Sequence, residues 1–308
     1  MTLEDYHSAR DGAPAEDEQS LRECLADPSQ RRIAALALVD VAERDGLADE
    51  TVAALARVVE TTGGPDARQF AVEAMGLAGT GVDVIRAALS DDHGWVRAEA
   101  VVALSRADPG ATAVLRAALD DDSGWVRRNA LIALGKLGAV DQSLLVDRIK
   151  TDPHPAAREY AAQFLPEAAD DTDEAVRILA AVLAREPNAY VRAKAADGLG
   201  ELATARAEEA LEKQGLTDRS DDVRRTARVA LANARGTDPE DIEIPGHNDE
   251  AGTPPMASPP GGSDAPSPAD PRSGAGDSHQ QGQRGQHPPS GPGPAPSREY
   301  GPDGGGSR

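Results

Sequence analysis

Apolar and polar positions along the chain follow a series of arginines spaced about thirty residues apart. These arginines, called marker arginines below, are Arg31, Arg68, Arg97, Arg127, Arg158, Arg192 and Arg224. An apolar residue precedes most of them, Ala follows three residues later, and Leu or Met follows seven residues later in every case. Because offsets of −1, +3 and +7 share one face of an α-helix, the pattern predicts a helix at each arginine.

A second apolar-periodic segment follows several of these helices. Such segments lie at 81–89, 110–119, 141–150 and 174–183. Asp, Pro, Ser and Gly separate the units, and these residues cap or break helices; Asp92, Asp122 and Asp152 stand where the next helix should begin. A single helical hairpin cannot bury its apolar face, whereas stacked hairpins can. The sequence therefore predicts an all-α, right-handed α-solenoid of six or seven hairpins.

Composition divides the chain into three parts. Aromatic residues make up only 3% of it, so Ala and Leu must form most of the core, which suits closely packed helices. Residues 237–308 hold 15 of the 23 Pro and 14 of the 30 Gly, and such a segment cannot bury enough surface to offset its chain entropy. We expect a flexible acidic N-terminus at 1–19, a repeat solenoid at 20–236 and a disordered tail at 237–308. Within the tail, DIEIPG at 241–246 could dock on the solenoid, although an unattached tail is the simpler interpretation.

The repeated stretches resemble a known family. They are DDHGWVRAEAVVAL (91–104), DDSGWVRRNALIALGKLG (121–138), NAYVRAKAADGLGEL (188–202) and SDDVRRTARVALAN (220–233). Over residues 20–236 the chain resembles the HEAT-repeat superfamily, in particular its PBS-lyase HEAT-like repeats. The resemblance implies a ladder of contacts between an Asp near each turn and the helix Arg.

Members of this implied ladder can be assigned by position. Asp92 matches Arg97, and Asp122 matches Arg127. Arg158, Arg192 and Arg224 continue the series, but Pro187 replaces the Asp before Arg192, which leaves that pair open.

Catalytic, cofactor and metal sites are not predicted. Deoxyhypusine hydroxylases resemble this solenoid and bind iron through repeated His-Glu dipeptides, but no His-Glu dipeptide occurs here. His93 and His154 belong to turns two units apart, and Cys24 has no His nearby in sequence. There is no phosphate-binding glycine loop that follows a strand. An enzyme or enzyme subunit of the lyase or hydroxylase type remains the alternative function.

Net charge argues against nucleic acid as the partner. The chain carries a formal charge of −21, and residues 1–236 hold 42 acidic and 28 basic residues, whereas phosphate binding requires a positive field. Abundant Asp and scarce Lys predict a halophilic, haloarchaeal origin. Without a membrane-length apolar run or a signal peptide, we expect a cytoplasmic protein. The arginines between 219 and 235 in the last repeat are interpreted as a solvated cap, with a phosphate or acidic-partner site as the alternative.

The remaining candidates for function are surface residues. Trp95, Trp125 and Tyr190 each stand two residues before a marker arginine, so the two Trp should be neighbours in the stack. Each ring either packs over its own helix start or forms a protein-binding edge, since Trp and Arg dominate interface energetics. Arg86 and Arg116 repeat in step on the second helices and could meet an acidic peptide. The leading hypothesis is a non-catalytic protein-interaction scaffold or adaptor with no cofactor.

Overall fold

The computed structural model describes residues 17–61 and 64–245, and these contain fourteen α-helices and no strand. The helices are α2 (Glu18–Cys24), α3 (Arg31–Asp45), α4 (Asp49–Thr61), α5 (Pro65–Leu77), α6 (Val82–Ala88), α7 (Gly94–Ala107), α8 (Thr112–Ala117), α9 (Gly124–Lys136), α10 (Gln142–Thr151), α11 (Pro155–Phe164), α12 (Thr172–Arg185), α13 (Ala189–Leu202), α14 (Ala205–Ala210) and α15 (Asp221–Arg235). Three short elements complete the list: the 3₁₀ turns η1 (Ala118–Asp120) and η3 (Pro239–Asp241), and the π-helical turn η2 (Leu211–Gly215).

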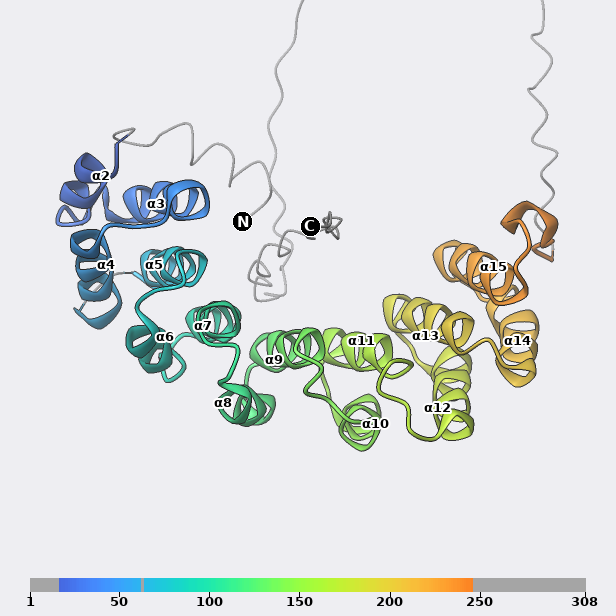
Figure 1. The fold of residues 1–308 in the computed structure, drawn as a ribbon. Helices are drawn as coiled ribbons and strands as arrows, with labels where there is room; N and C mark the ends of the chain where they lie inside the picture. Colours follow the sequence, from blue (N-terminus) through green and yellow to red (C-terminus); the bar gives the residue numbers. More distant parts are fainter. Residues whose placement is uncertain (1–16, 62–63, 246–308) are drawn as a thin grey trace, which may run out of the picture. The chain divides into compact units, whose positions relative to one another are not determined.

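The helices form two layers of stacked hairpins. Each helix that begins near a marker arginine packs on the next one, so that α3, α5, α7, α9, α11, α13 and α15 form one layer (Figure 1). The second helices, α4, α6, α8, α10, α12 and α14, form the other layer. The predicted all-α stack of helical hairpins is therefore confirmed, with six hairpins followed by α15.

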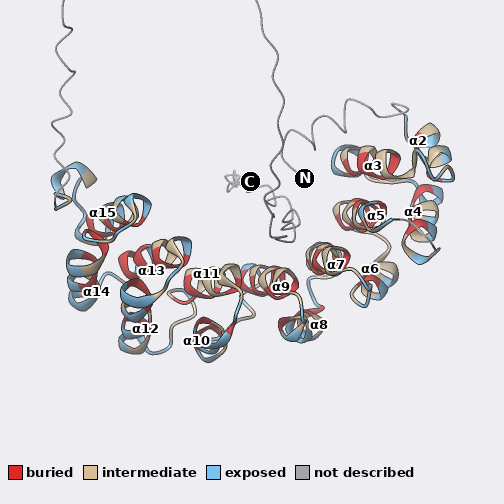
Figure 2. Cartoon of the chain, turned by 180° about the vertical axis from the view of Figure 1, so that it is seen from behind, coloured by how far each residue is buried: buried red, intermediate tan, exposed pale blue. Residues whose placement is uncertain are grey.

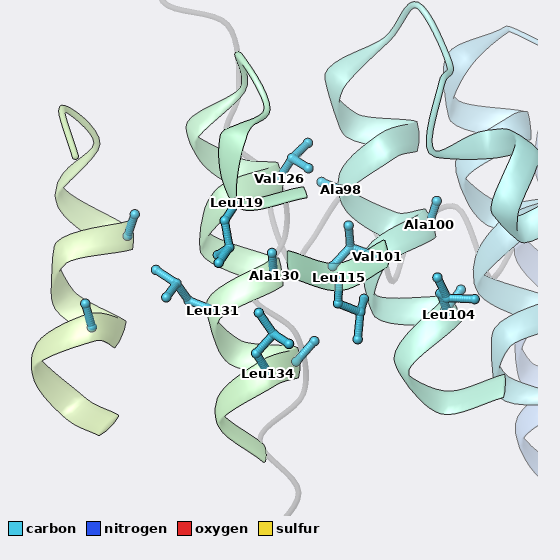
Figure 3. Close-up of a cluster of buried hydrophobic side chains, with 14 of the residues drawn as sticks. Ala98, Ala100, Val101, Leu104, Leu115, Leu119, Val126, Ala130, Leu131 and Leu134 are labelled. Carbon is cyan, nitrogen blue, oxygen red and sulfur yellow. The ribbon is translucent and has the colours of Figure 1, made fainter. Parts of the chain in front are cut away.

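The predicted helical stripe forms the core. Every Ala three residues after a marker arginine is 0% exposed, and the Leu or Met seven residues after it is at most 1% exposed. Figure 2 shows the buried residues along the helix faces that meet between the layers. In Figure 3, Leu104 of α7, Leu115 of α8 and Leu134 of α9 lie in one such cluster. Each buried Leu contributes roughly 1.5–3 kcal/mol, so this stripe accounts for the repetition of the sequence.

Small residues set the spacing within the first layer. A Cβ on Gly76 of α5 would lie 2.5 Å from the Cβ of Ala103 on α7, which is closer than two carbon atoms can pack. The helices therefore touch through backbone at this point, and a larger side chain would force them apart.

The described chain extends past the predicted boundary at Gly236. Gly236 ends α15 with a left-handed φ of 66°, and the following residues form η3. Ile242 and Ile244 are half-buried against the core, so the part of DIEIPG that the structure describes does pack on the solenoid. Most of the predicted tail, 246–308, and most of the predicted flexible N-terminus, 1–16, lie outside the described residues.

Candidate interaction surfaces

An ion-pair ladder joins the turns before α7, α9, α11, α13 and α15 to the first-layer helix of the preceding repeat. Arg97 on α7 donates from Nε and Nη2 to the two carboxylate oxygens of Asp121, at 2.9 Å each. Its Nη1 donates to the backbone oxygen of Asp91, in the turn of its own repeat, at 2.9 Å. The planar guanidinium thus connects the turn of its own repeat to the next turn. Its two bonds to the Asp121 carboxylate are bidentate, a geometry that favours Arg over Lys.

Four further rungs have the same geometry. The pairs are Arg68 with Asp91, Arg127 with Asp152, Arg158 with Glu186 and Arg192 with Asp218, with N–O distances of 2.7–3.0 Å. Each carboxylate also accepts a hydrogen bond from the backbone N–H two residues further on, which shapes the turn before the helix. One acid per turn therefore both builds the turn and closes the rung.

Burial makes these pairs energetically important. The side chain of Asp152 is 0% exposed and that of Arg127 is 10% exposed. Burial alone would raise the pKa of Asp152, but hydrogen bonds from Arg127 and the His154 backbone outweigh it and hold that pKa below its ordinary value. Removing one member of such a pair leaves an uncompensated buried charge, at a cost of about 3–5 kcal/mol.

A row of rings lies across three adjacent repeats. The Trp95 and Trp125 ring centroids are 6.2 Å apart with planes tilted by 34°, and the His154 ring meets Trp125 edge-on at 4.7 Å. Burial lowers the pKa of His154, so its ring stays neutral near pH 7 and packs as an aromatic group. All three side chains are half-buried.

Arg128 extends this row to α11. Its guanidinium carbon lies 4.9 Å from the Tyr160 ring centroid and 5.9 Å from that of Trp125, and Nη2 donates to the Tyr160 hydroxyl at 3.1 Å. Tyr160 in turn neighbours Phe164 at 6.4 Å. We call the set Trp95, Trp125, Arg128, His154, Tyr160 and Phe164 the aromatic row; cation–π contacts of this kind contribute roughly 0.5–2 kcal/mol.

Two carboxylates approach each other between α5 and α7. Burial and the negative charge of Glu73 raise the pKa of Glu99 to about 8, while Arg106 acts in the opposite direction. Gln69 provides a hydrogen bond to the ionised form. This pair is the reverse of a ladder rung, because the neighbouring charge with the largest effect on the pKa of Glu99 has the same sign as the Glu99 carboxylate.

The family follows from the sequence itself. The family model for HEAT repeats matches residues 52–135, 82–166 and 143–232, which together span more than half of the chain. The chain is a HEAT-repeat protein. Its similarity to solved structures agrees with this: the X-ray structure of YibA from Escherichia coli is 19% identical, with a TM-score of 0.54 over 75% of this chain and 87% of that chain.

Two other solved structures are less similar in shape. Human deoxyhypusine hydroxylase in complex with glycerol is 21% identical, with a TM-score of 0.35 over 76% of this chain and 90% of that chain. An engineered protein is 20% identical, with a TM-score of 0.34 over 72% of this chain and 100% of that chain. Among curated proteins, none matches this HEAT-repeat protein. At these identities the likeness to YibA shows the fold alone.

The ladder pairing differs from the one that the family resemblance implied. Asp92 and Asp122 do not pair with Arg97 and Arg127 of their own repeats; Asp92 accepts from Arg68, and Asp122 accepts from Arg97. The reason is that Nη1 of each arginine binds its own turn through backbone oxygens, which directs the other edge of the guanidinium to the next turn. The principal acid is the residue six positions before the next marker arginine, a spacing that the sequence displays.

The last two marker arginines, Arg192 and Arg224, differ in their partners. Arg192 is paired despite Pro187, because its partner is Asp218 in the next turn. Glu186, six positions before Arg192, binds Arg158 of the preceding repeat. Arg224 belongs to the last first-layer helix described, so it donates to the Asp218 backbone and to Asp221 of its own helix instead.

Of the candidate binding residues predicted from the sequence, the two tryptophans belong to the aromatic row and the other three do not. Trp95 and Trp125 are neighbours, as predicted, whereas Tyr190 lies outside the aromatic row with its side chain 72% exposed. Arg86 donates to Asp108, and Arg116 donates to the backbone oxygen of Ala139, each in a loop of the following repeat. These contacts give both arginines a structural role, and partner binding by either one stays a prediction.

Some members of the aromatic row were not predicted. Arg128, Tyr160 and Phe164 stand one, two and six positions after a marker arginine, offsets that the Trp pattern does not point to. Only the stacking of α9 on α11 brings them to the Trp pair. In residues 17–61 and 64–245, no group of three His, Cys, Asp or Glu side chains is arranged to hold a metal ion. In the same residues, no helix combines the length and apolar character that a membrane span requires.

Proposed function

We propose that this HEAT-repeat protein is a non-catalytic scaffold that binds another protein through its aromatic row. The observation that carries the proposal is the concentration of half-buried rings in one place. The chain has 2 Trp, 4 Tyr and 2 Phe, and four of these residues, including both Trp, belong to the row. The fully buried core consists mainly of Ala, Leu and Val, and Trp125, Tyr160 and Phe164 pack against its edge while remaining partly exposed.

The chemistry of the row suits a protein partner. Trp, Tyr and Arg are the residues that most often dominate binding energy at interfaces, because they offer a large contact area with few rotatable bonds. Arg128 is held between Trp125 and Tyr160, so little side-chain entropy remains to be lost on binding. The enzyme alternative has no comparable cluster in its favour among the described residues. The cytoplasmic, halophilic and PBS-lyase assignments stay predictions from the sequence.

A pair of variants tests the proposal. The protein is used as bait in a lysate of its source cells, and captured proteins are identified by mass spectrometry. We expect Trp95→Ala with Trp125→Ala to reduce capture of the specific partner at least tenfold, about 1.4 kcal/mol, whereas Tyr190→Ala retains it. Tyr190 is the matched control because it has the same offset from its marker arginine and lies outside the row. Equal capture by both variants would contradict the proposal.

Fluorescence separates loss of binding from loss of fold. Trp95 and Trp125 are the only tryptophans, so intrinsic emission reports on the row alone. Adding the captured partner to the wild-type protein should shift the emission to shorter wavelength and reduce quenching by iodide, because the rings lose water. Binding without any change in emission would place the interface elsewhere.

A further inference from the structure

The last marker arginine keeps half of the rung geometry. Arg224 is the fourth residue of α15, the helix position that Arg192 holds in α13. Its Nη1 donates to the backbone oxygen of Asp218 at 2.6 Å, as Nη1 of Arg192 donates to that of Glu186 at 2.9 Å. The half of the rung that binds the arginine to its own turn is therefore complete.

The half of the rung that binds an acid is different. In the five rungs, Nε and Nη2 bind a carboxylate of the next turn, and the side chain of that acid is at most 15% exposed. Arg224 instead donates from Nη2 to Asp221 of its own helix, whose side chain is 67% exposed. Within residues 17–61 and 64–245, Nε of Arg224 has no acceptor. The edge that binds a buried acid in the other arginines thus meets one solvent-exposed carboxylate.

A second cation stands on the same face of α15. The five rung arginines contact the next repeat, and so do the glycines eight residues after two of them, Gly76 and Gly200, so the residue four after the arginine faces that repeat too. In α5, α7, α9, α11 and α13 this residue is apolar and 0% exposed: Val72, Val101, Leu131, Ala162 and Ala196. In α15 it is Arg228, which is half-buried and makes no hydrogen bond or ion pair with the part of the chain that the structure describes. The stacking face of α15 therefore carries a guanidinium group where the other helices carry an apolar side chain.

The chain covers only part of this face. After α15, η3 packs on the side of the helix away from α13 (Figure 1), and Ala232, one turn after Arg228, is 0% exposed. The side chain of Arg224 is 22% exposed, and the neighbouring Arg225 is paired with Asp222. Arg224 and Arg228 are therefore the two cations of this face that can accept a further acid.

We propose that Arg224 and Arg228 bind an acidic segment of another protein, in which two neighbouring Asp or Glu side chains take the place of the turn of a next repeat. The stack itself contains the model for this contact: Arg97 binds Asp121 through Nε and Nη2 and also donates to Asp122, the next residue along the chain. In the complex, Nε and Nη2 of Arg224 hold one carboxylate while Nη1 keeps its own turn. Arg228 pairs with the second carboxylate.

The ligand is a carboxylate because this arginine position binds one wherever a next repeat follows. Five rungs hold it in bidentate geometry, which the planar guanidinium favours. Arg228 lies one helical turn from Arg224, roughly 5–6 Å between Cβ atoms, so neighbouring acids can pair with both arginines at once. Asp221 can release Arg224 because an exposed ion pair contributes little to stability. The surface lies outside the aromatic row and is a second binding site.

The site is tested on the full chain with two blocked peptides and NMR of arginine side chains. One peptide has the sequence of residues 120–124, which begins with three consecutive Asp from a ladder turn, and the control peptide has Asn in place of each Asp. We expect the aspartate peptide to shift the Nε–H resonances of Arg224 and Arg228 along one saturation curve and to leave Arg97 unchanged. The control peptide should shift none of them. Equal saturable shifts with inorganic phosphate at the same ionic strength would overturn the proposal, because they would show a general anion site.

Three variants locate the contact. Arg228→Gln should weaken binding of the aspartate peptide about fivefold or more and leave the fold intact, because Arg228 makes no hydrogen bond within the described chain. Asp221→Asn should strengthen binding about threefold, because it frees Nη2 of Arg224. Arg206→Gln, at an exposed position on α14, is the control and should not change binding. No saturable shift with the aspartate peptide, or equal binding by the wild type and Arg228→Gln, would overturn the proposal.

Two other occupants of this face are distinguished by further measurements. If the aspartate peptide binds only after residues 246–308 are removed, the face is filled from within the chain, and the proposal of a ligand from another protein is overturned. Self-association in sedimentation that Arg228→Gln abolishes would make the occupant a second copy of this chain and would also overturn it. Equal peptide binding by a monomer with and without residues 246–308 supports the proposal.

Discussion

Helices α9 and α3 each carry a marker arginine near their start, but Arg127 is the fourth residue of α9 and Arg31 is the first residue of α3. Arg127 binds Asp152 in a pair that is almost completely buried, whereas Arg31 binds only backbone oxygens of its own turn. The sequence also differs six positions before the next marker arginine, where Asp152 stands in the first case and Thr62 in the second. The repeat register places an arginine, but the start of its helix and the groups within reach differ between repeats, and with them the partners of the guanidinium.

Removing the acid of an interior rung should have the largest effect. In Asp152→Ala, Arg127 loses its buried counter-charge, and we expect the free energy of unfolding to fall by about 3–5 kcal/mol. Arg31→Met, which removes the first marker arginine, should cost about 1 kcal/mol or less, because no buried carboxylate is left behind. Urea unfolding of both variants measures the two losses in the free energy of unfolding. Equal losses would show that Arg127 and Arg31 do not differ in how strongly their contacts stabilise the fold.

A smaller effect is expected where helices touch through glycine. Gly76→Ala adds a Cβ that would overlap Ala103 on α7, so we expect a loss of about 1–3 kcal/mol as α5 and α7 move apart. Gly64→Ala, at the turn before α5, is the control: its Cβ meets nothing within 4 Å, and the expected cost is about 0.5 kcal/mol from a poorer helix start. A thermal melt of each variant compares the packed interface with the open turn.

A pH-dependent effect sharpens the contrast between an acid beside a cation and an acid beside a second carboxylate. The pKa of Asp152 is lowered in the folded state, so its contribution to stability is present above its unfolded pKa and is lost as the pH falls. The pKa of Glu99 is raised from 4.5 to about 8, so the folded state retains a proton that the unfolded state releases, and stability falls as the pH rises across that range.

Glu99→Gln should therefore stabilise the protein more at pH 8 than at pH 5. Urea unfolding at the two pH values measures the difference, and Glu60→Gln, at an exposed position on α4, is the control. A gain for Glu99→Gln that does not depend on pH would show that Glu99 and Glu73 do not repel each other in the folded protein.

Much of the fold could be predicted from the sequence because the apolar pattern of each helix involves residues that are close together in the chain. Ala100 and Leu104 stand three and seven residues after Arg97, and both are 0% exposed. A helix places such positions on one face whatever surrounds it, so the stripe could be assigned without knowing the neighbours. The contact between the two tryptophans was predictable for the same reason, since equal offsets in successive repeats lie side by side in a stack.

Contacts between unequal offsets could not be predicted in this way. The sequence places Asp122 close to Arg127, yet the side chain of Asp122 binds Arg97, one repeat earlier. It also gives no reason to group Tyr160 with Trp125, because their offsets from the marker arginines differ.

By itself, the sequence determined that this protein is a stack of helical hairpins, which residues form its core and where the two tryptophans meet. The tertiary structure decided which acid each arginine binds and which rings join the tryptophans. The physical reason is that helix periodicity is set by neighbours along the chain, whereas the direction of a long side chain depends on the adjacent repeat. A guanidinium carries its donors on a side chain long enough to reach either its own turn or the next, and only the stacking of the repeats brings one carboxylate within hydrogen-bond distance.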